Sequence, residues 1–528
     1  MELNGRNLIG YQEYSNGNST FQTIHPTSLE LLPTLFSNAT FEETDKAVQL
    51  ASSAFEMYAS TTRNQRIKFF QAIHHHILDL GSDLMDIFQE ESGLSFQRAV
   101  AERTRTLGQI QLFIEIIEKG DWMKASIDSP LPDRKPIPKP DIRKQLEPVG
   151  PIVVFGASNF PLAYSTAGGD TISALASGCP VIVKSHPMHA GTGELVARAI
   201  IQAAKETNMP EGVFSNLNSN TYEIGSYLVK HPHIKAVGFT GSITGGTALM
   251  KIANKRTEPI PVYAEMGSVN PVVVLPEILE LQMIRTVQQL AQSIRLDAGQ
   301  FCTHPGLIFT LDSSLSHTFR TQLATELNTQ KPQAMLHPDI WNVYQKNSAS
   351  HLAFKEVQEI TTPRELVKNH ITPTLTTTSG KTFLKNPLLA EEVFGSYSLV
   401  IVCTNLTELT SCLDRLKGQL TGSIFATPKE LISKRILIQT LKSKVGRLIF
   451  NGVPTGVEVC QSMHHGGPYP ATSHSHYGAV GHEGILRWTR PVSYQNWPDE
   501  LLPKALQNSN PMDIMRTIDG EWSHKKLA

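Results

Sequence analysis

The stretch PIVVFGASNFP, residues 151–161, decides the fold class, because a regular alternation of strand-like and helical segments begins there. Residues 151–155 form a short apolar run of the kind found in buried strands, and helical patterns separate it from the next strand-like runs. We expect strands at residues 151–155, 180–184, 213–217 and 234–239, and helices at residues 166–176, 191–204 and 222–230. This order favours an α/β fold in which helices cover both faces of a parallel sheet.

A second segment of the same kind extends toward the C-terminus. Its expected strands are residues 271–275, 306–311, 396–402, 422–425 and 447–450, and its expected helices are residues 280–295, 314–327, 349–359, 406–416 and 429–441. Ahead of the first sheet, four helices are expected between residues 40 and 118. A proline-rich connector leads into a strand-like run at residues 142–148, and residues 461–484 read as a loop with five glycines and five histidines.

The composition and the local sequence give no reason to expect a nucleic acid, membrane or metal partner. The 528-residue chain has a formal net charge of −1, which gives no electrostatic reason to expect nucleic acid or an anionic membrane. Its five cysteines contain no C-x-x-C pair, so we expect a reducing, cytoplasmic location. No signal peptide and no apolar run of about 20 residues is visible, so no membrane span is expected. The consecutive residues His74, His75 and His76 point in different directions on a helix, and no metal is predicted.

Cys302 is the first candidate for chemistry. It lies in the turn DAGQFCTHPG, residues 297–306, between a helical run and a strand-like run. Backbone N–H groups in such a turn can favour the thiolate, which is the nucleophilic form of cysteine. The ordinary alternative is a small buried hydrophobic side chain, as most free cysteines are.

Three other stretches carry candidate residues. Asn159 follows the first strand at the carboxyl edge of the expected sheet, where its amide could donate to an oxyanion or simply form a turn. Residues 237–242, VGFTGS, join a strand to a helix whose free N–H groups suit a pyrophosphate. Glu265 ends an apolar run, and it could be a general base or a solvated surface carboxylate.

Together with the turn EEVFG at residues 391–395, and in this order, these stretches resemble the motifs of the aldehyde dehydrogenase superfamily. The resemblance covers about residues 29–497. It implies an α/β fold with a Rossmann-type cofactor domain, an α/β catalytic domain and a small β oligomerisation extension. The implied boundaries are 1–130 and 151–263 for the cofactor domain, 264–460 for the catalytic domain, 131–150 and 487–505 for the extension, and 461–486 for a loop that returns to the cofactor domain.

The resemblance also implies roles for individual residues. Cys302 attacks an aldehyde to form a thiohemiacetal, Asn159 holds the oxyanion, and Glu265 activates the water that hydrolyses the resulting thioester. The cofactor-binding residues implied are Gly238, Thr240, Gly241, Ser242, Glu392 and Phe394. The extension strands imply a homodimer or homotetramer. The remote alternative is a non-catalytic member of the fold, because fold alone does not establish activity.

Two departures from the family pattern are informative. In sites for NAD an acidic residue binds the ribose 2′-hydroxyl. Here Lys184 ends the second strand, Ser185 and His186 follow it, and no acidic residue appears before Glu194. We therefore expect NADP to be preferred over NAD. The family's late acidic segment is replaced by GPYP at residues 467–470, so no acidic proton-relay residue is expected there.

Stretches such as GQFCTHPG and GGPYPATS resemble one branch, which contains 2,5-dioxopentanoate (alpha-ketoglutaric semialdehyde) dehydrogenases and an NADP-dependent fatty aldehyde dehydrogenase. An anionic substrate requires a cationic partner in the site, preferably a guanidinium. Arg105 lies on the helix expected at residues 95–118, which the resemblance implies to line the substrate tunnel. We expect Arg105 to bind the carboxylate of 2,5-dioxopentanoate. The alternatives are a medium- or long-chain fatty aldehyde substrate and an Arg105 that is solvated on the helix surface.

Overall fold

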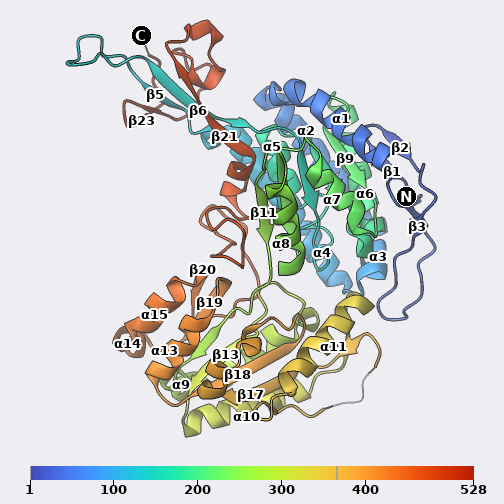
Figure 1. The fold of residues 1–528 in the computed structure, drawn as a ribbon, viewed down its shortest axis with the longest axis vertical. Coiled ribbons are helices and arrows are strands. Elements are labelled where there is room, and N and C mark those ends of the chain that lie inside the picture. The colour runs from blue at the N-terminus through green and yellow to red at the C-terminus, as the bar shows by residue number, and fades with distance from the viewer. Residues whose placement is uncertain (1, 364–366, 528) are drawn as a thin grey trace.

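The computed structural model describes residues 2–363 and 367–527. Figure 1 shows three parts: an α/β unit at the upper right, a second α/β unit below it, and a narrow β extension at the upper left that holds the C-terminus.

The first unit is a seven-stranded sheet with the order β11-β10-β7-β8-β9-β1-β2. Its five parallel strands are β7 (Ile152–Phe155), β8 (Val181–Lys184), β9 (Phe214–Leu217), β10 (Ala236–Thr240) and β11 (Val262–Glu265). The hairpin β1 (Asn7–Ile9) and β2 (Gln12–Tyr14) adds two antiparallel strands at one edge. The four strands expected from the sequence alternation are therefore confirmed to within two residues.

Alternating side chains of these strands pack against two layers of helices, since neighbouring residues on a strand face opposite sides of the sheet. Ile152 and Val154 face one hydrophobic cluster, and Val153 faces the other. The first cluster is covered by α2 (Arg63–Asp79), α3 (Gly81–Ser92), α4 (Phe96–Lys119), α5 (Gly169–Ser177) and α6 (Ala190–Glu206). The second is covered by α1 (Phe41–Ala59), α7 (Tyr222–Lys230) and α8 (Ile243–Asn254).

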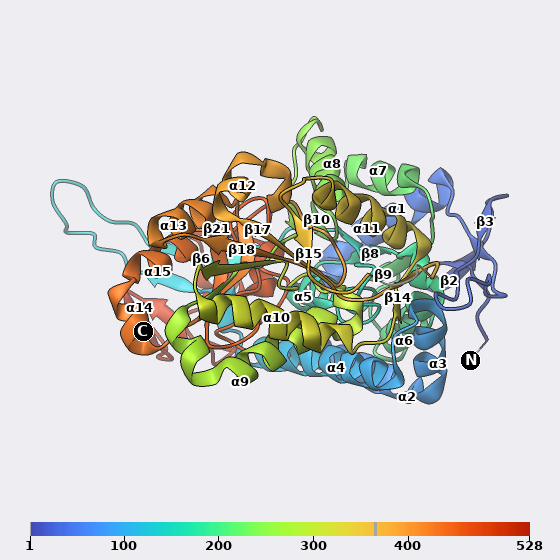
Figure 2. The same ribbon diagram turned by 90° about the horizontal axis from the view of Figure 1, so that it is seen from below.

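The second unit is another seven-stranded sheet, with the order β15-β17-β18-β13-β12-β19-β20. Its strands are β12 (Val272–Val274), β13 (Leu307–Leu311), β15 (Gln358–Glu359), β17 (Thr374–Ser379), β18 (Tyr397–Cys403), β19 (Gln419–Phe425) and β20 (Val445–Phe450). All pairs are parallel except β15 with β17. Figure 2 shows α9 (Pro276–Arg295) and α10 (Ser314–Asn328) on one side of β17 and β18, and α12 (Gly380–Lys385) and α13 (Leu406–Arg415) on the other.

Several sequence expectations for the second unit are wrong. The helix expected at residues 349–359 is α11 (Pro338–Leu352), which begins earlier because Pro338 occupies its first turn and His337 accepts a hydrogen bond from the N–H of Asp339. Residues 358–359 belong to strand β15 instead. The helix expected at residues 429–441 is two helices, α14 (Pro428–Ser433) and α15 (Arg435–Lys442), separated by the non-helical backbone of Lys434. In the first unit, the helix expected from residue 166 begins at Gly169, after a series of turns.

The extension is a five-stranded sheet with the order β21-β6-β5-β22-β23. Strands β6 (Ile142–Pro148) and β21 (Thr489–Gln495) pair antiparallel along their whole lengths; β6 is the strand-like run expected at residues 142–148, and β21 lies within residues 487–505, which the family resemblance assigned to the extension. Strands β5 (Ser126–Asp128), β22 (Arg516–Ile518) and β23 (Glu521–Ser523) complete the sheet. Two short hairpin-like pairs, β3 (Thr20–Phe21) with β4 (Phe36–Ser37) and β14 (Gln333–Ala334) with β16 (His370–Ile371), lie outside the three sheets. Within the described ranges, every helix is too short or too polar to cross a bilayer.

Candidate active site

The turn that carries Cys302 is held in an unusual backbone conformation. Asp297, Ala298 and Gly299 all have positive φ angles, of 45°, 55° and 68°. A Cβ added to Gly299 would lie 2.5 Å from the backbone of Gly395, so glycine is required there. The side chain of the fully buried Asn270 donates hydrogen bonds to the carbonyls of Cys302 (2.8 Å) and His304 (2.9 Å). Asn270, which the sequence analysis did not single out, thus fixes this turn.

Glu265 lies at the carboxyl end of β11, where two neighbours position it. Thr240 of β10 lies opposite it in the sheet, and the N–H of Gly241 donates to its carbonyl at 3.0 Å. On the free edge of β11, the loop expected at residues 461–484 runs alongside, since the N–H of Met266 donates to the carbonyl of Ala471 at 2.8 Å. This loop brings a third side chain, His465, to Cys302 and Glu265.

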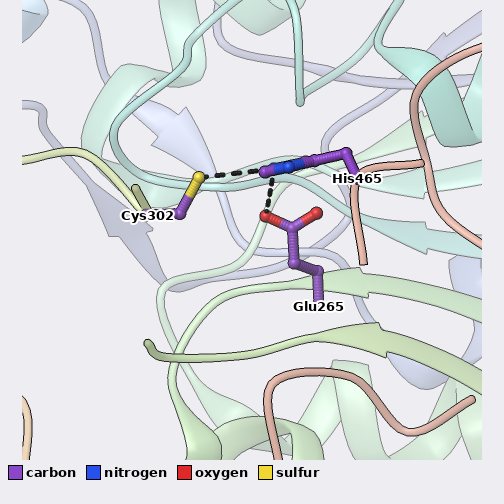
Figure 3. A group of neighbouring side chains, drawn as sticks. All are labelled: Glu265, Cys302 and His465. Carbon is purple, nitrogen blue, oxygen red and sulfur yellow. Dashed lines mark hydrogen bonds and ion pairs between the residues drawn. The ribbon is translucent and has the colours of Figure 1, made fainter. Parts of the chain in front are cut away.

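Figure 3 shows His465 lying between the thiol and the carboxylate. Its Nε2 is 3.5 Å from Sγ of Cys302 and 3.0 Å from Oε1 of Glu265. The imidazole is almost fully buried, with 1% of its side chain exposed, and Glu265 is 6% exposed. Its Nδ1 has no hydrogen-bond partner among the residues that the structure describes. One nitrogen is therefore placed to exchange a proton with either group.

The environment opposes the thiolate, contrary to the expectation from the turn alone. Burial raises the pKa of the Cys302 thiol well above its ordinary value, and the negative charge of Glu265 raises it further. Arg105 acts in the opposite direction but does not outweigh them. The sequence pattern could not show this, because Glu265 reaches the thiol from another part of the chain. Such a thiol reacts only when a base removes its proton.

Asn159 lies against the same turn. It follows β7, and its side-chain amide donates to the carbonyl of Gln300 at 2.9 Å. The backbone carbonyl of Asn159 accepts a hydrogen bond from Arg98 at 3.3 Å. An amide group carries two N–H donors, so the second remains for an oxygen bound at Cys302.

Arg105 of α4 reaches this region rather than the helix surface. Its guanidinium donates to the hydroxyl of Tyr164 at 2.8 Å and lies over the rings of Tyr164 and Phe160 at 5.1 and 5.7 Å. Burial lowers the pKa of Arg105, but Tyr164, Cys302 and Glu102 outweigh it and raise the pKa overall. The neighbouring Arg103 instead donates to the carbonyl of Gly81. The two arginines of α4 therefore have different surroundings.

The residues expected to hold a dinucleotide lie around the ends of β10 and β8. Ser242 caps α8 by accepting a hydrogen bond from the N–H of Gly245 at 3.1 Å. A Cβ on Gly241 or Gly245 would lie 2.7 or 2.9 Å from the ring of Phe239, so the glycines let this ring pack closely against the turn. The first N–H groups of a helix have no intrahelical partner and attract phosphate, so the exposed start of α8 fits a pyrophosphate. Gly238 is different, because it is buried and faces Asp170 and Trp488.

Lys184 ends β8, and Ser185 and His186 follow it; no carboxylate pairs with Lys184 among the residues that the structure describes. Lys184 donates to the carbonyl of Ser219 at 2.5 Å, and burial lowers its pKa to about 8. Burial lowers the pKa of His186 well below its ordinary value, and the ring stacks on His189. Ser185 packs against Gly193. The next acidic residue, Glu194, is occupied elsewhere, because it accepts hydrogen bonds from the backbone N–H groups of Asn4 and Gly5 and pairs with Arg198.

Glu392 and Phe394 lie near the backbone that follows Glu265. The carboxylate of Glu392 accepts a hydrogen bond from the N–H of Ser268 at 3.3 Å, and a Cβ on Gly267 would lie 2.4 Å from its Oε2. Burial raises the pKa of Glu392 to about 7. Both side chains line a cavity with Phe301 and His304 of the Cys302 turn.

Cys302, Glu265 and His465 could also bind a metal ion, since their donor atoms lie within 4.8 Å of one another. Thiolate, imidazole and carboxylate are zinc ligands in other proteins. The prediction that no metal is needed stays a prediction.

The sequence profile of the Aldehyde dehydrogenase family matches residues 13–491. The chain belongs to this family, and it is an oxidoreductase that acts on an aldehyde with a nicotinamide cofactor.

Two relatives match almost the entire chain. It is 43% identical to alpha-ketoglutaric semialdehyde dehydrogenase 2 of Azospirillum brasilense over 529 residues, which cover 99% of this chain and 100% of the relative. It is also 43% identical to the alpha-ketoglutaric semialdehyde dehydrogenase of Acinetobacter baylyi, with 98% of this chain and 99% of the relative covered. A point mutant of betaine aldehyde dehydrogenase from Staphylococcus aureus has the same fold, with a TM-score of 0.80 at 20% identity over 93% of this chain and 96% of that one.

Proposed function

We propose that this enzyme oxidises 2,5-dioxopentanoate, also called alpha-ketoglutaric semialdehyde, to 2-oxoglutarate with NADP. The observation that carries the proposal is the position of Arg105, whose guanidinium lies on Tyr164 within electrostatic reach of Cys302. A carboxylate at the far end of a short aldehyde would find there the cation that it requires. The names of the two relatives at 43% identity support the same substrate.

The first step uses His465 as the base. Its Nε2 accepts the proton of the Cys302 thiol while Sγ forms a bond to the aldehyde carbon. The carbonyl oxygen becomes an oxyanion, to which the side-chain amide of Asn159 and the backbone N–H of Cys302 donate. One donor in such a site contributes about 3 kcal/mol to the transition state. This assigns the activation of the thiol to a residue that the motif resemblance did not include.

A bound oxidised nicotinamide would supply the hydride acceptor for the thiohemiacetal, and Cys302 would then hold the product of that oxidation as a thioester. Glu265 then takes a proton from water, whose oxygen attacks the thioester carbon. The carbon–sulphur bond breaks, and the protonated His465 returns its proton to the departing sulphur. In this proposal Glu265 and His465 serve opposite halves of the cycle.

Three features of the site support a preference for NADP. Lys184 ends β8, no ion pair occupies it in the described part of the chain, and Glu194 is bound to the N-terminal backbone. A ribose 2′-phosphate would therefore meet a cation rather than a carboxylate. Thr240, Gly241 and Ser242 would hold the pyrophosphate, and Glu392 and Phe394 the nicotinamide ribose. Because Gly238 is buried in β10, it would not touch the cofactor and would influence binding only through the backbone conformation of that strand.

The test compares kcat/KM for 2,5-dioxopentanoate, pentanal and hexanal, each with NADP and with NAD. We expect at least a tenfold advantage for the oxo acid over both alkanals, and a higher value with NADP. Replacing Arg105 with Ala removes one charge-assisted contact, so KM for the oxo acid should rise about tenfold to a hundredfold while the alkanals are spared. Arg103→Ala is the matched control on the same helix. A wild-type enzyme that prefers the alkanals would favour the fatty aldehyde alternative.

Other expectations are also proposals. The sheets suggest domain limits close to those given by the family resemblance, with residues 126–128 and 516–523 assigned to the extension because β5, β22 and β23 belong to its sheet. Edge strands such as β21 invite pairing, which supports a homodimer or homotetramer. A monomeric mass at micromolar concentration in light scattering would refute that. The cytoplasmic location stays a proposal as well.

A further inference from the structure

A second arginine approaches the same region from the other α/β unit. Arg447 lies on β20, and a Cβ on the preceding residue, Gly446, would lie only 2.0 Å from the carbonyl oxygen of Gly466. Strand β20 therefore passes directly against the loop that carries His465. Arg447 is partly buried, on the same side of the strand as Val445.

The guanidinium of Arg447 is only partly used by the protein. It donates to the carbonyl of Gly456 at 2.8 Å and to the carbonyl of Pro454. Its Nε is buried and has no acceptor among the described residues, and the same is true of Nε of Arg105. A guanidinium has five N–H donors, and leaving a buried donor unpaired is unfavourable because the group has lost its hydrogen bonds to water. Both arginines thus present N–H groups for which the protein supplies no acceptor in the described part of the chain.

The segment that Arg447 holds leads to the aromatic cluster beneath Arg105. Val457 and Val459 follow the carbonyls of Pro454 and Gly456, and both pack against the cluster that contains Phe160, Tyr164 and Phe301. The guanidinium of Arg105 lies over two of these rings. Arg105 therefore lies on the cluster directly, and Arg447 holds the backbone that leads into it from the other α/β unit.

Electrostatic contacts agree with this geometry. Burial lowers the pKa of Arg447, and Cys302 and Tyr164 act against that shift. The same thiol and the same phenol act on Arg105. In the described ranges neither arginine forms an ion pair with a carboxylate, so their charges remain for a ligand.

We propose that Arg447 is a second specificity-determining residue, which together with Arg105 binds the carboxylate and the adjacent 2-oxo group of the aldehyde substrate. The proposal rests on the proposed function, and it adds a residue that neither the motif resemblance nor the comparisons point to. A 2-oxo acid presents three acceptor oxygens at one end, more than one guanidinium fork can pair in a plane. An alkanal presents none, so it would leave the Nε–H groups of both arginines unpaired.

The test uses three aldehydes of equal chain length: 2,5-dioxopentanoate, 5-oxopentanoate and pentanal. Arg447→Met keeps the apolar stem and removes the guanidinium. We expect it to lower kcat/KM about tenfold to a hundredfold for 2,5-dioxopentanoate, less for 5-oxopentanoate, and no more than threefold for pentanal. Arg447→Lys keeps the charge without the planar fork and should give an intermediate loss. Lys444→Ala, which removes a cation just before β20, is the control and should leave the three values unchanged.

Other outcomes are informative. An equal loss for all three aldehydes would mean that Arg447 only supports the backbone at residues 454–456, and the proposal would be wrong. Unchanged values would also overturn it. The inhibition constant of 2-oxopentanoate, which lacks the aldehyde, gives a readout without chemistry and should rise about tenfold to a hundredfold in Arg447→Met. The wild-type preference for oxo acid over pentanal tests the proposed function separately, because it involves no variant.

Discussion

Replacing His465 with Gln gives the sharpest test of the proposed mechanism. The amide nitrogen of Gln can occupy a position near Nε2, but it cannot accept a proton from the Cys302 thiol. The variant thus removes the base and keeps a side chain of similar reach between Cys302 and Glu265. The loss is expected in the step that forms the thiohemiacetal.

The size of the rate loss expected in His465→Gln follows from the environment of the Cys302 thiol. Even a cysteine with the ordinary pKa of 9.0 is only about one per cent ionised at pH 7, and burial and Glu265 raise the pKa of Cys302 well above that value. Without a base, attack must depend on this small thiolate fraction. A general base contributes about a hundredfold to ten-thousandfold, so we expect the burst rate of NADPH formation at pH 7 to fall by that range.

The pH dependence of the burst rate provides a second test, with an expected direction. Because the pKa of Cys302 is raised, the thiolate becomes more abundant as pH rises toward that pKa. In His465→Gln the burst rate should therefore increase about tenfold per pH unit from pH 7 upward, whereas the wild-type rate should change much less. Rapid-mixing absorbance of the reduced nicotinamide measures both. His464→Gln, at the adjacent position, is the control. A His465→Gln burst within threefold of wild type, with the same pH profile, would remove His465 from the mechanism.

The remaining predictions address the other residues of the site. Cys302→Ala should give no burst of NADPH. Glu265→Gln should keep the burst and slow steady-state turnover about a hundredfold or more. Near-normal turnover in Glu265→Gln would exclude Glu265 as the base for water. Gly267→Ala places a Cβ 2.4 Å from Oε2 of Glu392 and should raise KM for the cofactor more than KM for the aldehyde, which steady-state kinetics with both substrates varied will show. Lys184→Ala should lower the ratio of kcat/KM with NADP to that with NAD about tenfold, and an unchanged ratio would locate the discrimination elsewhere. Dialysis against EDTA should leave kcat unchanged; activity that is lost and then restored by zinc would assign the Cys302 cluster to a metal.

The sequence predicts the parallel sheets well because their strands are buried on both faces. Such strands read as short apolar runs, and β7 and β8 were located in this way. Strand β17 was missed because its sequence TLTTTS is mostly threonine, so its burial comes from the neighbouring strands and not from an apolar pattern. Strands β22 and β23 are three residues each, too short for a period to be visible. Alternation therefore predicts the central strands, and tertiary contacts decide the edges.

Local motifs likewise predict those site residues whose position depends on one turn. Cys302 and Asn159 each sit in a loop next to a strand, and the order of the strands brings those loops to one edge of the fold. The environment of Cys302 could not be predicted in the same way. Its raised pKa depends on Glu265 and on burial, and these depend on how two α/β units meet.

His465 lies next to the place where the family's late acidic segment is missing, and a comparison of motifs does not show which residue acts there instead. The absence of the late acidic segment was visible in the sequence, and so was the histidine pair just before residues 467–470. Nothing local connects that pair to the thiol, because tertiary contacts of the loop, such as its backbone contacts with β11, bring it to Cys302. The replacement has chemical consequences. An imidazole can accept the thiol proton while neutral and then stabilise Glu265 as an ion pair at 3.0 Å, which a second carboxylate so close to Glu265 would oppose by charge repulsion. In the proposed cycle the proton taken from the thiol therefore stays on His465, beside the carboxylate of Glu265, until it returns to sulphur, so that the first half of the reaction places a positive charge next to the base of the second.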